Sequence, residues 1–462
     1  MASPSIADEH RSVRRPAARM QIVSILVWLS AGIIAALLGA DGSAAGGARA
    51  TLAMSVLSVA LGVWLFWVHG GTRITAVGVW GFAFALFVGV AGWFTVVIFR
   101  QPPPNLLQAL VIAYFGQVAM YGLFWRRSAR PAAAIRWPVD PLVARWGIGV
   151  GSVLLLGSSL ASLLGAREVV LVDATAFASA VLLAASLLLH RGSGLGVLRL
   201  ALTVGAFLAY AFFVFSGFGR LTLGALGLAI GIVATKWFPG RTIKGAILLL
   251  SVPTLVILSQ TRVEFTAQLN PNQGSITGFE SVTSPLVAFA RLLEMHTQTP
   301  LAWGSTFWAS AVALVPHSIW PNKPPGFGAE LVPILSPELV GTGHSEAALS
   351  HGEWLYNFGP IGLVLMVVAL GLVVRAIDRW LETATSRPVW DRRRLLSFVG
   401  AAIAAAGLVD LVWVGTFTWV ARSGSRLLII GLLTLLSWIL SPARVHGPRV
   451  HGPPRVAALV DG

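Results

Sequence analysis

Uninterrupted apolar runs recur along this chain, and many are about 18 residues or longer, enough to cross roughly 30 Å of hydrocarbon as an α-helix. A helix satisfies its own backbone hydrogen bonds, so many such runs indicate a helical bundle in a membrane. Hydrophobic residues make up 56% of the 462 residues and charged residues 11%, which is far from the composition of soluble domains. The sequence therefore predicts an all-α polytopic membrane protein with about twelve transmembrane helices.

The predicted spans are interrupted by short polar connections and flanked by two basic tails, residues 1–20 and 441–462. We expect the second tail to be disordered, because it repeats Arg, Val, His, Gly and Pro without an apolar pattern. The predicted spans are 21–40, 51–69, 74–99, 105–125, 146–165, 169–190, 200–217, 221–235, 245–259, 353–374, 395–417 and 427–440.

The distribution of Lys and Arg predicts the orientation of these spans. With the N-terminus in the cytoplasm, the inner segments hold 24 of the 33 Lys and Arg residues and the outer segments hold nine. This asymmetry is typical of membrane proteins and puts both termini in the cytoplasm. The net charge of +15 then mostly reflects topology and attraction to anionic lipid. Nucleic acid is not expected as a partner, because the basic residues are spread over many short connections.

One predicted outward connection, residues 260–352, is 93 residues long and separates spans nine and ten. Its segment "PHSIWPNKPPGFG" (316–328) has four prolines and two glycines, which excludes a spanning helix and indicates a rigid turn-rich segment. The apolar run 301–316 is too short to span and is expected to lie on the membrane surface. Long ordered connections are usually functional, so we expect this loop to be partly helical and to cap an outer cavity.

Cationic and aromatic residues around this loop are candidates for substrate binding. A single outer Arg is explained as an anchor at a helix end, but several Arg residues around one loop suit a phosphate, which guanidinium binds bidentately. One of them lies in "ARSGSR" (421–426), which also contains Arg422. The candidates are Arg220, Arg262, Arg291, Arg426, His317, Lys323 and Trp320.

The segment "GHSEAALSHGEWLYNFGPIG" (343–362) leads into the tenth span and carries further candidates. Its possible acid–base groups are His344, His351 and Glu353, since each side chain can exchange a proton. Tyr356 and Asn357 are candidates for binding substrate. A solvated Glu at the membrane edge is the alternative explanation for Glu353.

"IWPNKPPGFG" followed by "GHSEAALSHGEWLYNFGPIG" resembles the bacterial O-antigen or oligosaccharide repeat-unit polymerases of the Wzy type. These are related to O-antigen ligases and to other polyprenyl-linked glycan polymerases. The specific part of the resemblance covers residues 316–362, and the arrangement of spans extends it to most of the chain. It implies a location in the bacterial inner membrane, a polyprenyl-pyrophosphate-linked glycan as donor and acceptor, and a partner that regulates chain length.

The resemblance implies transfer of the donor glycan from pyrophosphate to an acceptor hydroxyl, with inversion at the sugar carbon. Cations near the departing pyrophosphate stabilise the transition state more than the ground state, and Arg can supply this charge. The predicted outer segments contain no pair of Asp residues spaced like a divalent-metal site, so we expect neither a metal nor another cofactor. Polymerase and ligase activities remain alternatives, because the sequence does not identify the acceptor.

Two other functions are compatible with the same sequence. Another type of membrane glycosyltransferase uses an acidic residue in its first outer loop, where this chain has Asp41, although a capping role also explains that residue. A transporter also suits twelve spans, and Asp173 and Asp410 lie in or near spans, where ionisable residues are often functional.

The predicted topology can be tested by cysteine labelling, because the chain contains no Cys. A cysteine introduced by Ser275→Cys is expected to react with a membrane-impermeant maleimide from outside intact cells. Labelling of this position only after the inner face is opened would contradict the orientation.

Overall fold

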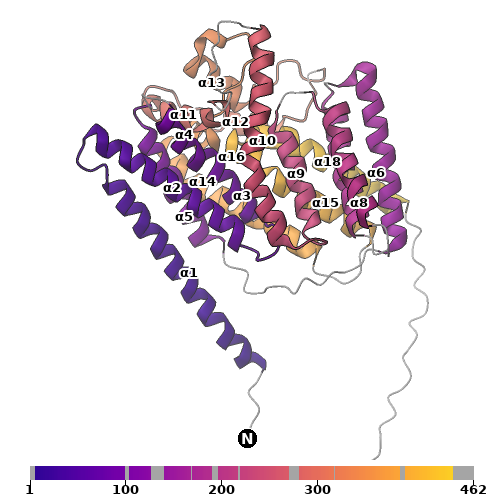
Figure 1. Ribbon diagram of the computed structural model, residues 1–462. Coiled ribbons are helices and arrows are strands. Elements are labelled where there is room, and N and C mark those ends of the chain that lie inside the picture. Colours follow the sequence, from indigo (N-terminus) through magenta and orange to yellow (C-terminus); the bar gives the residue numbers. More distant parts are fainter. Residues whose placement is uncertain are drawn as a thin grey trace, which may run out of the picture.

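The computed structural model describes residues 6–98, 103–125, 140–167, 169–189, 196–216, 219–269, 280–316, 318–385 and 391–440. Every regular element in these ranges is a helix (Figure 1). Position 317, the 270–279 segment and the 441–462 tail lie outside the described residues, and with them the expectations for His317, for part of the long loop and for the tail.

The helices follow the apolar runs of the sequence. The first half of the chain forms α1 (Ile6–Leu37), α2 (Ala44–Val68), α3 (Ala76–Phe84), η1 (Ala85–Val90), α4 (Ala91–Ile98), α5 (Leu106–Leu123), α6 (Pro141–Ala161), η2 (Ser162–Ala166), α7 (Val170–Leu189), α8 (Gly196–Ala209) and η3 (Tyr210–Val214). The second half forms α9 (Leu221–Ala234), α10 (Gly240–Leu269), α11 (Glu280–Met295), α12 (Ser305–Ala311), α13 (Phe327–Leu335), η4 (Pro337–Leu339), α14 (Leu349–Ala384), α15 (Arg392–Ala406), α16 (Leu408–Trp413), α17 (Thr416–Trp419), η5 (Val420–Gly424) and α18 (Ser425–Ile439).

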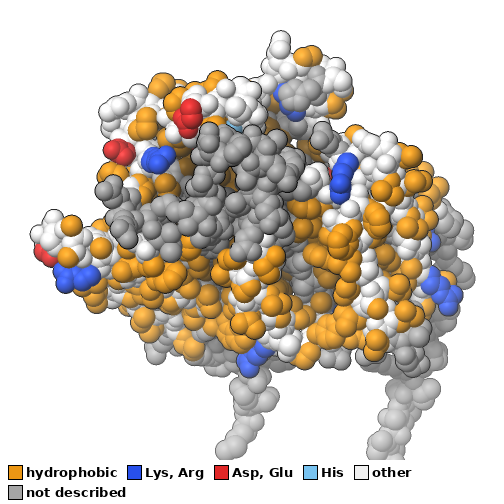
Figure 2. All heavy atoms as spheres, turned by 45° about the horizontal axis from the view of Figure 1, so that its top comes forward, with side chains coloured by type: hydrophobic (Ala, Val, Ile, Leu, Met, Phe, Trp, Pro, Cys, Tyr) orange, Lys and Arg blue, Asp and Glu red, His pale blue; other side chains and the backbone are white. Residues whose placement is uncertain are grey.

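The prediction of an all-α polytopic membrane protein is confirmed. Eleven helical stretches in the described residues are long and apolar enough to cross a membrane. The predicted span 221–235 corresponds to α9, whose 14 residues are fewer than the roughly 20 that a straight crossing needs. Hydrophobic side chains dominate the flanks of the bundle, and few charged side chains interrupt them (Figure 2).

Glycines bring α2 into close contact with the continuous helix formed by α3, η1 and α4. A methyl group at Gly62 would collide with the carbonyl oxygen of Gly81, and one at Gly89 would lie 2.6 Å from the backbone nitrogen of Val59. Small residues of this kind allow helices in membranes to approach closely and gain dispersion contacts. These glycines therefore set the close packing between α2 and the helix formed by α3, η1 and α4.

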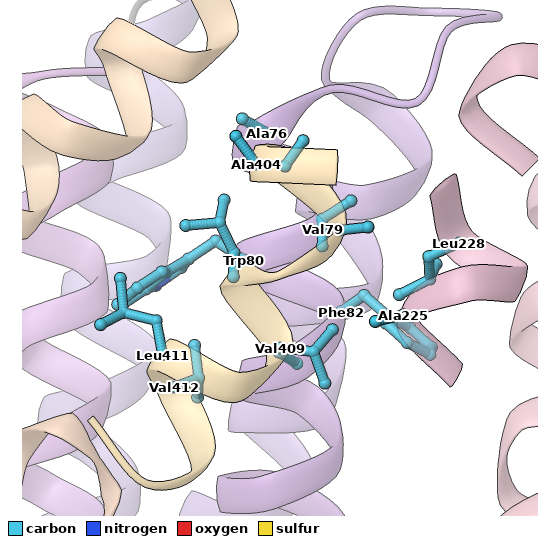
Figure 3. Packing of buried hydrophobic residues seen from close by; sticks show 14 of the residues in the cluster. Ala76, Val79, Trp80, Phe82, Ala225, Leu228, Ala404, Val409, Leu411 and Val412 are labelled. Carbon is cyan, nitrogen blue, oxygen red and sulfur yellow. The ribbon is translucent and has the colours of Figure 1, made fainter. Parts of the chain in front are cut away.

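The centre of the bundle is formed by α3, which packs against α2, α14, α15 and α16. Figure 3 shows Trp80 of α3 with Leu411 and Val412 of α16 beside it. The side chains of α3 are almost fully buried, and the indole nitrogen of Trp80 donates a hydrogen bond to the side-chain oxygen of Gln117 on α5 (2.7 Å). This bond satisfies a polar atom that would otherwise be buried without a partner.

Buried Lys244 on α10 connects that helix to the end of α2. Its ammonium group donates to the carbonyl oxygens of Trp67 (3.4 Å), His69 (3.1 Å) and Gly71 (2.9 Å). The last carbonyls of a helix have no partner within the helix, so Lys244 satisfies groups that the bundle would otherwise leave unpaired.

Two helices are broken near the same end of the bundle. Gly359 has φ +62° and ψ −153° and precedes Pro360, so α14 consists of two segments joined by a kink. Gly415, with φ +117°, separates α16 from α17 and forms the turn of the last helical hairpin. Both conformations are disfavoured for residues with a Cβ atom.

The helices α11, α12 and α13 lie over this end of the bundle, opposite the N-terminal end of α1 (Figure 1). We call residues 280–348 the cover segment and this end the cover end. Gly326 packs so closely against Phe417 of α17 that a methyl group there would collide with the ring. The amide of Glu346 donates to the carbonyl oxygen of Gly328 (2.9 Å) and closes the cover segment on itself.

Substituting Gly62 tests the close packing of α2. We expect Gly62→Ala to destabilise the protein by about 1–3 kcal/mol, because the added methyl group overpacks a rigid backbone contact. The melting temperature in detergent should fall. Gly157→Ala is the matched control, since its Cβ would meet open space and Ala favours a helix. Equal melting temperatures for the two variants would contradict the close packing.

Candidate functional site

Glu353 lies in the first turns of α14 and is fully buried. Its Oε2 accepts a hydrogen bond from the backbone amide of Thr416 (2.6 Å), and its Oε1 accepts one from the hydroxyl of Thr306 (3.3 Å). A methyl group at Gly415 would collide with the same carboxyl group, so only glycine fits at this turn. Glu353 thus joins the first segment of α14 to the cover segment and to the last hairpin.

Asn357 is one turn further along α14 and completes the same junction. Its Nδ2 donates to the Thr306 hydroxyl (2.6 Å), and its Oδ1 accepts from the amide of Gly304 (2.9 Å). The amide of Trp303 also donates to the Asn357 carbonyl oxygen (3.0 Å). Glu353 and Asn357 are four residues apart, so both face the cover segment.

His351 is separated from this cluster, although it is only two residues from Glu353. It is buried, and its ring lies 5.6 Å from the ring of Phe289 on α11. Residues two positions apart on a helix face in nearly opposite directions. The structure therefore does not bring His351 and Glu353 together as an acid–base pair.

His344 lies in the cover segment and contacts another carboxylate. Its Nε2 is 3.3 Å from Oε1 of Glu346, which also accepts a hydrogen bond from Ser336 (2.6 Å). The His344 side chain is 32% exposed, whereas the side chains of His351 and Glu353 are buried. Of the three predicted acid–base residues, only His344 is accessible to an external group.

The segment 421–426, predicted as part of a connection, is helical and belongs to η5 and α18. Arg422 Nη1 is 2.6 Å from Oδ1 of Asp410, which is fully buried on α16. The Arg422 side chain is 27% exposed, and its guanidinium group also lies against Gly219, where a methyl group would be 2.5 Å from Nη2. Arg422 was not among the predicted site residues, and only its position four residues before Arg426 connected the two in sequence.

Arg426 lies one turn further along and is almost fully buried. Its Nη2 is 3.4 Å from Oδ2 of Asp173, and its guanidinium carbon lies 3.7 Å from the centre of the Phe177 ring. The hydroxyl of Tyr210 donates to the other oxygen of Asp173. Two of the Arg426 nitrogens, Nε and Nη1, have no hydrogen-bond partner among the described residues. Asp173 and Asp410, considered above as transport residues, are therefore both paired with Arg.

The other predicted arginines are distributed differently. Arg220 directly follows Gly219 and precedes α9. Arg291 is exposed on α11. Arg262 belongs to the final part of α10, where side chains lie outside the described residues. Among the predicted outer arginines, Arg220 is the one that lies next in sequence to the Gly219 backbone against which Arg422 packs.

Three predicted binding residues remain. Lys323 and Trp320 lie in the cover segment, and Tyr356 lies on α14. Lys323 donates to the carbonyl oxygens of Ala313 (3.1 Å) and Val315 (2.9 Å), so it holds the chain that follows α12. Trp320 is partly exposed. Tyr356 forms a hydrogen bond with Glu330. Burial raises the pKa of Glu330, although its hydrogen bonds with Tyr356 and Ser305 oppose the rise.

The arrangement supplies a guanidinium group that is both oriented and accessible. Asp410 holds one end of Arg422, and the planar fork leaves other N–H donors for an anion. No group of three or more His, Asp or Glu side chains suitable for a metal occurs among the described residues.

No known protein-family model matches this chain, and neither the curated proteins nor the solved structures include a similar one.

Substitutions at Glu353 separate a structural role from a role of its charge. We expect Glu353→Gln to preserve the melting temperature in detergent, because the amide can accept from Thr416 and donate to Thr306. Glu353→Ala should destabilise the protein by about 2–4 kcal/mol, since it leaves a buried amide and hydroxyl without their partner. If Glu353→Ala melts at the wild-type temperature, Glu353 does not hold this junction.

Proposed function

We propose that this protein is a membrane glycosyltransferase that polymerises glycan repeat units carried on a polyprenyl pyrophosphate. The reaction would occur at the cover end, with Arg422 and Arg220 binding the pyrophosphate leaving group. This proposal agrees with the resemblance of residues 316–362 to repeat-unit polymerases, and the arginine arrangement provides its physical support.

The observation that carries the proposal is the position of Arg422. Its side chain is partly exposed at the cover end, and its guanidinium group is paired through one nitrogen with buried Asp410 and adjacent to the backbone at Gly219. A preoriented guanidinium group stabilises charge that develops during a reaction better than one that must first be ordered. Planar Arg also suits two phosphate oxygens at once.

The cover segment provides surfaces suited to a lipid-linked substrate. Two large aromatic side chains of this segment remain exposed: Trp303 is 76% exposed and Trp308 is 57% exposed. Exposed Trp is typical of the interface between hydrocarbon and water. A donor whose lipid remains in the bilayer would place its pyrophosphate at this interface. A cationic site there could bind the pyrophosphate without moving the lipid out of the bilayer.

The proposed reaction transfers one glycan without an additional reactant. The oxygen of an acceptor hydroxyl forms a bond to the first carbon of the donor sugar, and the bond from that carbon to pyrophosphate breaks. The bonding electrons leave with the polyprenyl pyrophosphate, and the hydroxyl proton passes to a base. Direct displacement inverts the sugar carbon. His344 is the best placed base of the three candidates because its side chain is accessible, and Glu353 acts as a positioning residue.

A transporter is the second candidate, and one observation favours it. The breaks at Gly359 and Gly415 resemble the discontinuous helices that form midplane binding sites in many transporters.

Transfer of the glycan to a different acceptor, as in ligases, is a third candidate function and belongs to the same enzyme class as the polymerase. Purified protein supplied with lipid-linked repeat units distinguishes these functions, since only a polymerase lengthens the glycan with repeat units alone.

We expect Arg422→Lys to reduce chain growth by roughly 10²–10³-fold, because Lys keeps the charge but lacks the planar fork. Arg49→Lys is the matched control, since Arg49 also pairs with an aspartate (Asp41, 3.3 Å) but on an exposed surface. Glycan length is measured on gels after reconstitution into proteoliposomes. The double variant D410N/R422Q, which removes both charges and leaves no unpaired buried carboxylate, should melt normally and be inactive.

Equal rates for Arg422→Lys and Arg49→Lys would contradict the proposed role of Arg422. Movement of intact lipid-linked units across the membrane, without any lengthening of the glycan, would instead support the transporter.

A further inference from the structure

A polar pocket lies at the opposite end of the bundle from the cover segment. It is open to solvent and lies where the turn between α2 and α3, the turn between α9 and α10, and the end of α14 meet. The proposed transfer reaction does not use it. Its polar lining includes Arg73, Lys236, Asp378 and Glu382, and its apolar lining includes Ile74 and Phe398.

The two cations of the pocket come from different turns. Arg73 belongs to the α2–α3 turn and Lys236 to the α9–α10 turn, and neither forms an ion pair with a described residue. Lys236 Nζ instead lies 5.9 Å from the centre of the Phe398 ring. Burial, together with the nearby charge of Arg73, lowers the pKa of Lys236 to about 7. A bound anion would relieve the repulsion between these cations.

The two carboxylates of the pocket come from one helix. Asp378 and Glu382 are four residues apart on α14, so they share a face of the helix and their negative charges repel each other. Asp378 Oδ1 accepts a hydrogen bond from the amide of Ala76 (3.0 Å) at the start of α3. Glu382 is exposed and has no ion pair with a described residue. The pocket thus carries two positive and two negative groups that do not form ion pairs across it.

We propose that this pocket binds a phosphate ester that carries a primary amine a few atoms away, as in ethanolamine phosphate. The phosphate would contact Arg73 and Lys236, and the amine would contact Glu382 and Asp378. A ligand with only negative charge would face two carboxylates, and a ligand with only positive charge would face two cations. A ligand with both charges complements both sets.

This chemistry occurs in a lipid headgroup and in a soluble phosphate ester. Trp237 and Phe238 follow Lys236 directly, and their ring centres are 6.4 Å apart. Aromatic residues beside a cation are typical of the interface where lipid headgroups lie. The apolar wall formed by Ile74 and Phe398 would accommodate the carbon chain next to the phosphate.

The experiment measures the melting temperature and ligand affinity of the purified full-length protein. One arm compares nanodiscs of phosphatidylethanolamine, phosphatidylcholine and phosphatidylglycerol, and the other titrates soluble phosphoethanolamine and inorganic phosphate in detergent. We expect an amine-bearing phosphate to raise the melting temperature more than inorganic phosphate or phosphatidylglycerol does. A shift only with phosphatidylethanolamine identifies a lipid site, and a comparable shift with soluble phosphoethanolamine identifies a site for small molecules.

Substitutions in the pocket test which residues contact the phosphate and which contact the amine. Lys236→Met and Arg73→Gln should each weaken binding by roughly tenfold or more, because each removes a charge-assisted hydrogen bond. Glu382→Gln should weaken the amine-bearing ligand but leave the affinity for inorganic phosphate unchanged. Without ligand, Lys236→Met should melt no lower than wild type, since it removes a repulsion. Arg49→Gln, at an exposed ion pair elsewhere, is the control and should bind normally.

Three results would overturn the proposal. The first is an equal shift for phosphatidylcholine, whose quaternary amine has no N–H to donate, and phosphatidylethanolamine. The second is unchanged affinity in Lys236→Met and Arg73→Gln. The third is an equal effect of Glu382→Gln on both soluble ligands, which would remove the amine from the assignment.

Discussion

Hydrocarbon cannot solvate a charge, so a charge buried among membrane-spanning helices requires a partner from the protein itself. In this bundle the partner comes from a distant part of the chain or from the next helical segment. Asp173 on α7 pairs with Arg426 on α18, and Asp410 on α16 pairs with Arg422 in η5. Lys244 donates to three carbonyl oxygens at the end of α2. Removing one member of such a set would leave the other buried and unpaired, so these contacts restrict which helices can be neighbours.

The same constraint applies to the backbone. Irregular backbone is tolerated in a membrane protein only where protein groups satisfy its hydrogen bonds. At the cover end, the turn at Gly415 is stabilised because Glu353 accepts from the Thr416 amide, and the chain before α12 is held by Asn357. These contacts connect the cover segment, α14 and the last hairpin. The position of Arg422 depends on this junction, since η5 directly follows α17.

The two ends of the bundle differ in how they use charge. At the cover end, Arg422 is already paired with Asp410 and is oriented by it. At the opposite end, Arg73 and Lys236 have no ion pair with a described residue and face two carboxylates across a pocket. An oriented cation suits the stabilisation of a transition state, whereas unpaired groups of both signs suit the binding of a ligand that carries both charges. The two proposals therefore depend on different residues and can fail independently.

Sequence alone determined the class of fold, because apolar runs of sufficient length permit few structures other than membrane-spanning helices. It also identified Glu353 and Asn357 as residues of interest. Their partners Thr306 and Thr416 could not be predicted, since these contacts join segments 47 to 63 residues apart. The segment 421–426 looked like a connection because Ser and Gly disfavour helices in isolation, yet packing keeps it helical. His351 and Glu353 were adjacent candidates in sequence. Their spacing on a helix already directs them to opposite sides of α14. Only tertiary structure decided that Phe289 packs against one side and that Thr306 and Thr416 bond to the other, because these partners come from distant segments.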